Sequence, residues 1–130
     1  NYTYQRTRVG DLFGDEAQRL PNSPEHLASV RGIAPLVPEL ANLAVRVRAE
    51  SRRRALVIDD DGDARLIEGD VPLLMDVVLS GEVRAWHLSY AVGVRNAFGW
   101  RYGYPAGEEV ALPLVPQPGR QFFVQTTLTY

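Results

Sequence analysis

One-by-one alternation of apolar and polar side chains is the feature that most constrains the fold. In residues 86–94, large apolar side chains hold every second position, and small or polar residues lie between them. Residues 121–130 repeat the pattern, with Phe123 as an exception on the polar side. Successive side chains of a β-strand point to opposite faces, so both segments are predicted strands with a different environment on each side.

Four further segments alternate in the same way, so the sequence predicts six strands. They are residues 1–8, 28–34, 41–50 and 71–80. A helix is the alternative for residues 39–54, which are rich in Leu, Ala and Arg. Arg46 and Arg48 flank Val47, however, and this order favours a strand over a helical stripe.

The predicted strands are joined by connections of two lengths. Long polar connections cover residues 9–25, 51–70 and 98–120, and short ones lie near residues 35–40 and 80–84. Long loops on one side and tight turns on the other are typical of outer-membrane barrels, whose turns are periplasmic. The fold class predicted is therefore all-β: an antiparallel transmembrane β-barrel segment of about six up-and-down strands.

Six strands are too few to form a barrel alone. About eight is the smallest number whose interior side chains can fill, and an open sheet edge in lipid leaves unpaired backbone groups. We therefore expect the chain to complete a larger barrel with further strands, on the same polypeptide or a separate one. The chain starts with Asn1 rather than Met, which suggests a processed or cleaved piece.

The composition excludes several classes of partner and site. The 130 residues are 45% hydrophobic and carry a net charge of −2, so no nucleic-acid partner is expected. The absence of Cys excludes disulfides, thiolate metal sites and Cys nucleophiles. The sequence has no run of about 18 apolar residues that would predict a spanning helix. It has no signal peptide either. The lack of an apolar run does not exclude a membrane barrel, because each barrel strand has only one apolar face.

Catalytic and metal-binding patterns are weak. Residues 59–70 are rich in Asp, but alignment with a calcium loop puts Val57 at its first ligand position, and Asp61-Gly62 is more typical of a hairpin turn. His26 and His87 are far apart and show no metal-type spacing. No nucleophile motif occurs, so we expect no enzyme activity, metal or cofactor. The arginines at 52–54 fit a solvated loop base better than a site for anionic lipid or ligand.

Four segments also resemble one family. RLPNSPEHLASVRG (19–32) resembles the start of a late strand in TonB-dependent outer-membrane receptors, and SRRR (51–54) follows an ascending strand as it does there. VGVRNAFGWRYGYPAG (92–107) resembles their penultimate strand, although the family pattern has Leu and Asp where this chain has Ala97 and Gly99. PGRQFFVQTTLTY (118–130) resembles their last strand, with Tyr130 in place of the usual terminal Phe.

The resemblance implies a location and a function. Residues 1–130 would be the C-terminal portion of a plugged barrel of about twenty-two strands in the outer membrane of a Gram-negative bacterium. Such a receptor imports a scarce ligand of the siderophore, cobalamin or glycan class. Its implied partners are the remaining strands and plug, outer-membrane lipid, the barrel-assembly machinery, and TonB through the absent N-terminal part. The ligand cannot be read from this segment.

Two sets of site residues follow. The resemblance implies that the last strand is a C-terminal assembly signal, read by a partner that adds a strand to its edge. Trp86 and Trp100 are predicted membrane-interface aromatics, while Tyr90, Tyr102 and Tyr104 nearby favour this less strongly. The residues assigned to the assembly signal are Phe122, Val124, Thr126, Leu128 and Tyr130.

Two alternatives remain open at this point. The first is an outer-membrane barrel that has lost transport and has a structural role in an envelope complex. A plug and a TonB-contacting segment upstream would separate it from a receptor. The second is a soluble ligand-binding β-barrel, which would leave cells without detergent.

Overall fold

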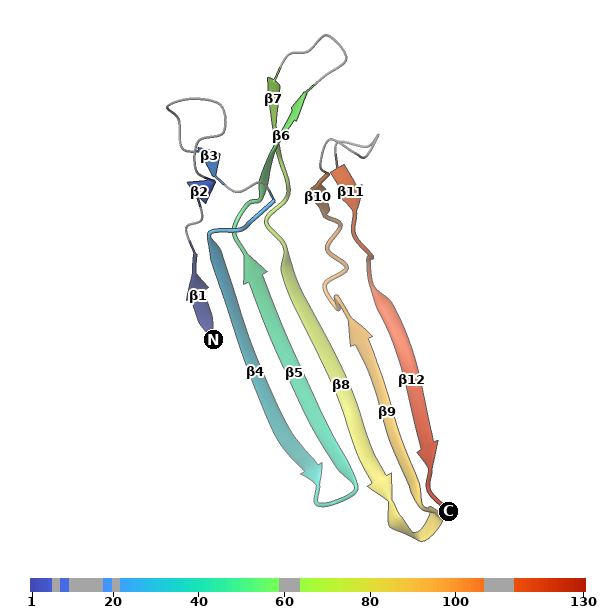
Figure 1. Ribbon diagram of the computed structural model, residues 1–130. Coiled ribbons are helices and arrows are strands. Elements are labelled where there is room, and N and C mark those ends of the chain that lie inside the picture. Colours follow the sequence, from blue (N-terminus) through green and yellow to red (C-terminus); the bar gives the residue numbers. More distant parts are fainter. Residues whose placement is uncertain (6–7, 10–17, 20–21, 59–63, 107–113) are drawn as a thin grey trace. The chain divides into compact units, whose positions relative to one another are not determined.

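The chain is an all-β protein in a computed structural model (Figure 1), which describes all residues except 6–7, 10–17, 20–21, 59–63 and 107–113. A six-stranded antiparallel sheet has the strand order β1-β4-β5-β8-β9-β12. Its strands are β1 (Tyr2–Tyr4), β4 (His26–Val37), β5 (Ala41–Glu50), β8 (Leu73–Val83), β9 (Leu88–Arg95) and β12 (Gln121–Leu128).

Three two-stranded hairpins lie in the connections between these strands. They are β2 (Arg8–Val9) with β3 (Gln18–Arg19), β6 (Arg54–Ile58) with β7 (Ala64–Glu68), and β10 (Gly103–Pro105) with β11 (Leu114–Pro116). A 3-10 helix, η1, covers Arg84–Trp86. Among the described residues, no helix has the length and apolar character needed to cross a membrane.

The six predicted strands are confirmed, with shifted ends. The helix alternative for residues 39–54 is wrong, because β5 occupies Ala41–Glu50. The prediction that a strand begins at Trp86 is also wrong: Trp86 ends η1, and His87 has a left-handed backbone (φ 48°) before β9 starts. The expected long loops were incomplete predictions, since each contains a hairpin.

Contacts divide the chain into two compact units. Unit 1 comprises Asn1–Ala28, Ala49–Pro72 and Arg101–Gln117, and unit 2 comprises Ser29–Arg48, Leu73–Trp100 and Pro118–Tyr130. Unit 1 therefore holds the hairpins and unit 2 holds most of the long strands.

In unit 2, the register of β8, β9 and β12 assigns each side chain to a face. Val92 lies opposite Leu79 on β8 and Val124 on β12, so these three apolar residues share one face. Gly93 lies opposite Val78 and Phe123 on the other face. We call the first the apolar face and the second, which also contains Asp76 and Ser80 of β8 and Ser89 of β9, the polar face.

Two glycines fix this register by making room for aromatic rings. The Tyr90 hydroxyl donates a 2.9 Å hydrogen bond to the carbonyl of Leu40, and a Cβ on Gly81 would lie 1.7 Å from that carbonyl oxygen. On the polar face, a Cβ on Gly93 would lie 2.7 Å from the Phe123 ring. Phe123 is therefore an apolar residue on the polar face because its ring packs over Gly93, which has no side chain. Aromatic rings that cover a glycine in this way stabilise glycine-containing strands.

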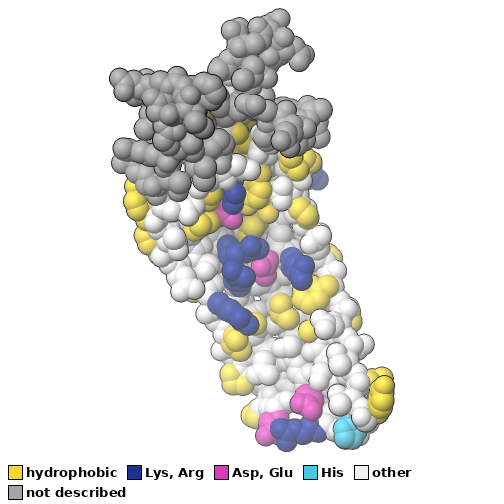
Figure 2. Space-filling view, viewed as in Figure 1, with side chains coloured by type: hydrophobic (Ala, Val, Ile, Leu, Met, Phe, Trp, Pro, Cys, Tyr) yellow, Lys and Arg dark blue, Asp and Glu magenta, His cyan; other side chains and the backbone are white. Residues whose placement is uncertain are grey.

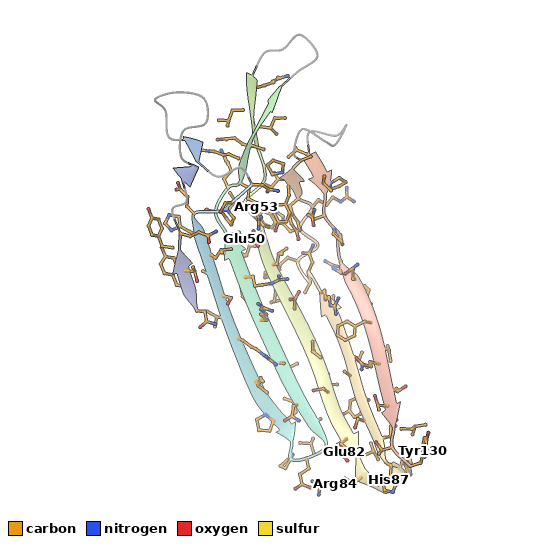
Figure 3. All side chains as sticks on the ribbon, viewed as in Figure 1. Glu50, Arg53, Glu82, Arg84, His87 and Tyr130 are labelled. Carbon is orange, nitrogen blue, oxygen red and sulfur yellow. The ribbon has the colours of Figure 1, made fainter. Side chains whose placement is uncertain are left out.

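The two short connections of unit 2 lie at one end of its strands. Residues 38–40 join β4 to β5, and residues 84–87 join β8 to β9. Arg84 forms a 3.1 Å ion pair with Glu39, and the backbone N–H of Thr129 donates to the carbonyl of His87. Arg84, His87 and Tyr130 lie together there in Figure 3. The predicted short turns are confirmed within a few residues.

Unit 1 has a small core made of small residues. Ala55 and Ala106 are buried, and Pro72 and Pro105 are fully buried. A Cβ on Gly69 would lie 2.8 Å from the ring of Pro105, so only a glycine allows this approach. Within unit 1, the β6–β7 hairpin thus packs closely against β10.

Candidate functional site

The apolar face of unit 2 is open. Among the described residues no second layer covers it: Phe122 is 78% exposed, Val124 73% and Val92 44%. Val30, Ile33 and Leu36 of β4 are exposed as well. On β4, Val30 and Leu36 share one side of the strand and Ile33 lies on the other. Phe122, Val124 and Val92 form an exposed apolar patch on the apolar face, and patches of this kind mark interaction surfaces.

Two of the long strands have the length of a transmembrane strand, whereas β9 and β12 are shorter, with 8 residues each. β8 has 11 residues and β5 has 10, within the usual range of 9–11 residues for a transmembrane strand. At about 3.3 Å per residue, β8 is about 36 Å long. Tilted by about 45°, it would cover about 25 Å, which is the height of the apolar band of a membrane barrel.

Trp86 and Trp100 flank β9. Trp86 ends η1 and is 70% exposed, and Trp100 follows β9 and is 43% exposed. Asn96 holds the second position: its side-chain oxygen accepts from the Trp100 backbone N–H at 2.9 Å, and its amide donates to the Trp100 carbonyl at 2.8 Å. Asn96 is buried and has a left-handed backbone (φ 50°). The two indoles therefore bracket one strand without meeting.

The residues assigned to the assembly signal lie on or just after β12. Phe122, Val124, Thr126 and Leu128 share the apolar face, opposite Val94, Val92, Tyr90 and Leu88 of β9. Tyr130 follows the strand and is fully exposed. β12 ends the strand order, so within the described sheet its second edge has no neighbour.

The polar face of unit 2 carries a charged cluster. Arg48 of β5 reaches Asp76 of β8 at 3.3 Å. The second oxygen of Asp76 accepts the backbone N–H of Asn96 at 3.1 Å. Figure 2 shows basic side chains gathered around an acidic one on this face. Asp76 thus accepts a hydrogen bond from Asn96, the residue that follows β9, and balances the charge of Arg48.

A second cluster, which we call the clasp, lies in unit 1 and comprises Glu50, Arg53 and Tyr104. One Glu50 oxygen accepts from Arg53 Nη2 at 2.6 Å, from Arg53 Nε at 3.1 Å and from the Tyr104 hydroxyl at 3.1 Å. The Arg53 guanidinium lies 4.1 Å from the centre of the Tyr104 ring and also donates to the carbonyl of Asn22. Figure 3 shows Glu50 and Arg53 side by side.

The clasp joins the three long connections, because Asn22, Arg53 and Tyr104 come from a different one each. Its electrostatics favour a neutral phenol: burial and the charge of Glu50 raise the pKa of Tyr104 to about 12. The hydrogen bonds of the clasp therefore link the three long connections to one another. The clasp was not predicted from the sequence, although the spacing of Glu50 three residues before Arg53 was a signal of an ion pair.

The remaining arginines of the SRRR segment contact Glu68. Arg52 and Arg54 lie 2.6 and 2.9 Å from its two oxygens, and the Arg52 hydrogen bond holds the pKa of Glu68 below its usual range. Asp59, Asp61 and Gly62 of the calcium alternative lie outside the described residues. The antiparallel pairing of β6 with β7 on either side of them agrees with the hairpin interpretation.

The two histidines are not brought together. His26 Nδ1 and the Tyr2 hydroxyl are hydrogen-bonded at 2.8 Å, and the His26 ring stacks with Tyr2 and lies tilted against Tyr4. His87 lies in a short turn of unit 2. In the described part of the chain, no three His, Asp or Glu side chains form a group suited to a metal. Comparisons with protein-family models, with curated proteins and with solved structures gave no match for this chain.

Proposed function

We propose that the chain is part of the wall of an outer-membrane β-barrel, of the TonB-dependent receptor type that imports a scarce ligand. The single observation that carries the proposal is the pair of unlike faces in unit 2. One face exposes Val92, Phe122 and Val124, and the other carries Asp76 and Arg48. A barrel strand needs this arrangement, since it has lipid on one side and a polar interior on the other.

The connections support the same proposal. Short turns at 38–40 and 84–87 alternate with long connections that contain hairpins, the asymmetry of outer-membrane barrels. The edge of β12 supports it too, because a closed barrel would pair that edge with another strand. The proposal assigns the chain transport and no catalysis. Its TonB-dependent character rests on the sequence resemblance alone.

Topology provides the direct test. Single cysteines are placed at Leu66 in the β6–β7 hairpin and at Arg84 in a short turn, both exposed. In intact cells, a membrane-impermeant thiol reagent should label the Leu66→Cys variant. The Arg84→Cys variant should react only after lysis, because short turns face the periplasm. The chain itself has no Cys, so the unchanged protein is a clean background.

Fractionation is the necessary control. The chain should sediment with outer membranes and require detergent for release. Release by buffer alone would instead support a soluble ligand-binding barrel, and labelling of only Arg84→Cys in intact cells would reverse the orientation. Equal labelling of both variants in intact cells contradicts a membrane wall.

A further inference from the structure

The polar face of unit 2 has more positive than negative charge at one place. Arg46 and Arg48 are two residues apart on β5 and therefore share a face about 7 Å apart. Arg95 of β9 and Asp76 of β8 each lie next to the paired residues Val94 and Val77, so they share the opposite, polar face. We call Arg46, Arg48 and Arg95, with Asp76 among them, the arginine patch.

Asp76 does not balance this charge. Both of its oxygens are engaged, one by Arg48 and one by the backbone of Asn96. Among the described residues Arg46 has no acidic partner, and Arg95 contacts only a ring, with its guanidinium 5.2 Å from the centre of Phe123. Arg48 Nε is buried and has no hydrogen-bond partner in the described structure. The patch therefore has free donors and a surplus of two positive charges.

The shape of the patch suits a small ligand. Its three arginines lie on adjacent strands of the order β5-β8-β9, within about 10 Å across the sheet. Within unit 2, its neighbours along the strands on the same face are uncharged: Ala44, Val78 and Gly93. The next residue after Arg48 on this side of β5 is Glu50, whose carboxylate is bound by Arg53. The positive charge is thus confined to a small area, whereas an acidic polypeptide would need positive charges along the length of a strand. Guanidinium groups match the paired oxygens of carboxylates and phosphates.

From this arrangement we propose that the arginine patch binds a small polyanionic solute through closely spaced carboxylate or phosphate oxygens. The inference rests on the proposed function, because it places the patch on the interior face of the barrel wall and makes the transported ligand, or a part of it, anionic. An anionic lipid headgroup would not reach this site, since lipid contacts the opposite face.

The test uses the full chain, purified in detergent together with any strands that accompany it. Citrate and pyrophosphate are titrated calorimetrically, with glucose as the neutral probe. At least one anion should bind, more weakly as sodium chloride is raised, and an anionic phospholipid in the micelles should not compete. The Arg46→Gln, Arg95→Gln double variant should bind about tenfold more weakly or worse. Arg84→Gln, a matched change in an exposed turn, should bind as the unchanged protein does.

Several results would overturn the inference. They are no binding of either anion, equal binding by the double variant, or competition by the phospholipid. A fourth is an Arg46→Cys thiol that does not react with a small water-soluble reagent, under conditions in which Arg84→Cys does react. Another segment would then cover the patch. The proposed function is judged separately by fractionation. Membrane location without anion binding overturns only the inference, whereas anion binding by a buffer-soluble chain overturns only the barrel wall.

Discussion

In unit 1, carboxylates meet guanidinium groups and small apolar residues are buried. In unit 2, one sheet face exposes large apolar side chains, and among the described residues Arg46 and Arg95 on the other face have no acidic partner. Glu50 and Glu68 each contact arginine side chains, and Ala55 and Pro105 form a small core. In unit 2, Phe122 and Val124 are open on one face and Arg46 on the other. Unit 1 thus has a small buried core, and unit 2 has two unlike faces.

The comparison teaches that alternation alone does not decide what a strand contacts. β6 and β9 are both strands of this chain, but Ala55 of β6 is buried while Val92 of β9 is 44% exposed. The free-energy cost of an exposed valine depends on the medium around it, because in lipid such exposure costs nothing.

The largest expected effect comes from charging the apolar face of unit 2. Val92→Arg should destabilise the assembled protein by about 2–4 kcal/mol if the site is near the bilayer midplane. Ser89→Arg, on the polar face of the same strand, should cost clearly less. Denaturant unfolding in phospholipid vesicles measures both. Since both positions are exposed, a water-soluble fold would tolerate the two changes alike, and equal effects would contradict the contrast between faces.

The next effect concerns the glycine that admits Tyr90. Gly81→Ala should cost about 1–3 kcal/mol, because its Cβ would occupy the position of the Leu40 carbonyl and overpack the site. Gly32→Ala is the matched change in β4, where a Cβ meets nothing within 4 Å. It should be neutral or slightly stabilising. The same unfolding measurement distinguishes them, and equal losses would mean that the register does not depend on Tyr90.

In unit 1, the clasp should give a smaller effect that depends on pH. Tyr104→Phe should cost about 0.5–1.5 kcal/mol at neutral pH, the usual contribution of one hydrogen bond. Because the folded state raises the pKa of Tyr104 from 10.0 to about 12, the stability linked to this shift is present below pH 10. It is lost as the pH rises from 10 to 12. The unchanged protein should therefore lose stability over that interval relative to Tyr104→Phe.

Tyrosinate absorbance provides the check on this clasp. One late ionisation step should be present in the unchanged protein and absent in Tyr104→Phe, while Tyr130→Phe should retain it. Glu50→Gln should move the step to lower pH, because the charge of Glu50 contributes to the shift. A step unmoved by Glu50→Gln would show that the carboxylate does not act on Tyr104.

The smallest effect is expected at Glu68, which is exposed although two arginines contact it. Glu68→Gln should leave the unfolding midpoint unchanged, since exposed ion pairs add little and are screened by salt. The pKa of Glu68, followed by NMR, should be low in the unchanged protein and should return toward its usual value in Arg52→Gln. A large loss of stability in Glu68→Gln would place this pair in the core of unit 1.

The set of strands and their two faces can be predicted from the sequence alone. Successive side chains of a strand point to opposite sides, so the alternation around Val92 and Val124 encodes both without any knowledge of neighbours. The alternation of short and long connections was readable for the same reason, as intervals between strands. Trp86 was assigned to β9 in error, because a 3-10 turn followed by one left-handed residue preserves the spacing of apolar residues in the sequence.

The contacts between residues far apart in the sequence follow from the folded chain and could not be predicted. The clasp joins Glu50 to Tyr104, and the arginine patch gathers residues of β5, β8 and β9. The β2–β3 and β10–β11 hairpins were not recognised, because strands of two or three residues give too little periodicity. The β6–β7 hairpin had one sequence signal, the dipeptide Asp61-Gly62. Pairing between strands depends on register, and a slip of one residue exchanges the two faces. In β8, β9 and β12 that register is held by contacts such as Tyr90 over Gly81 and Phe123 over Gly93.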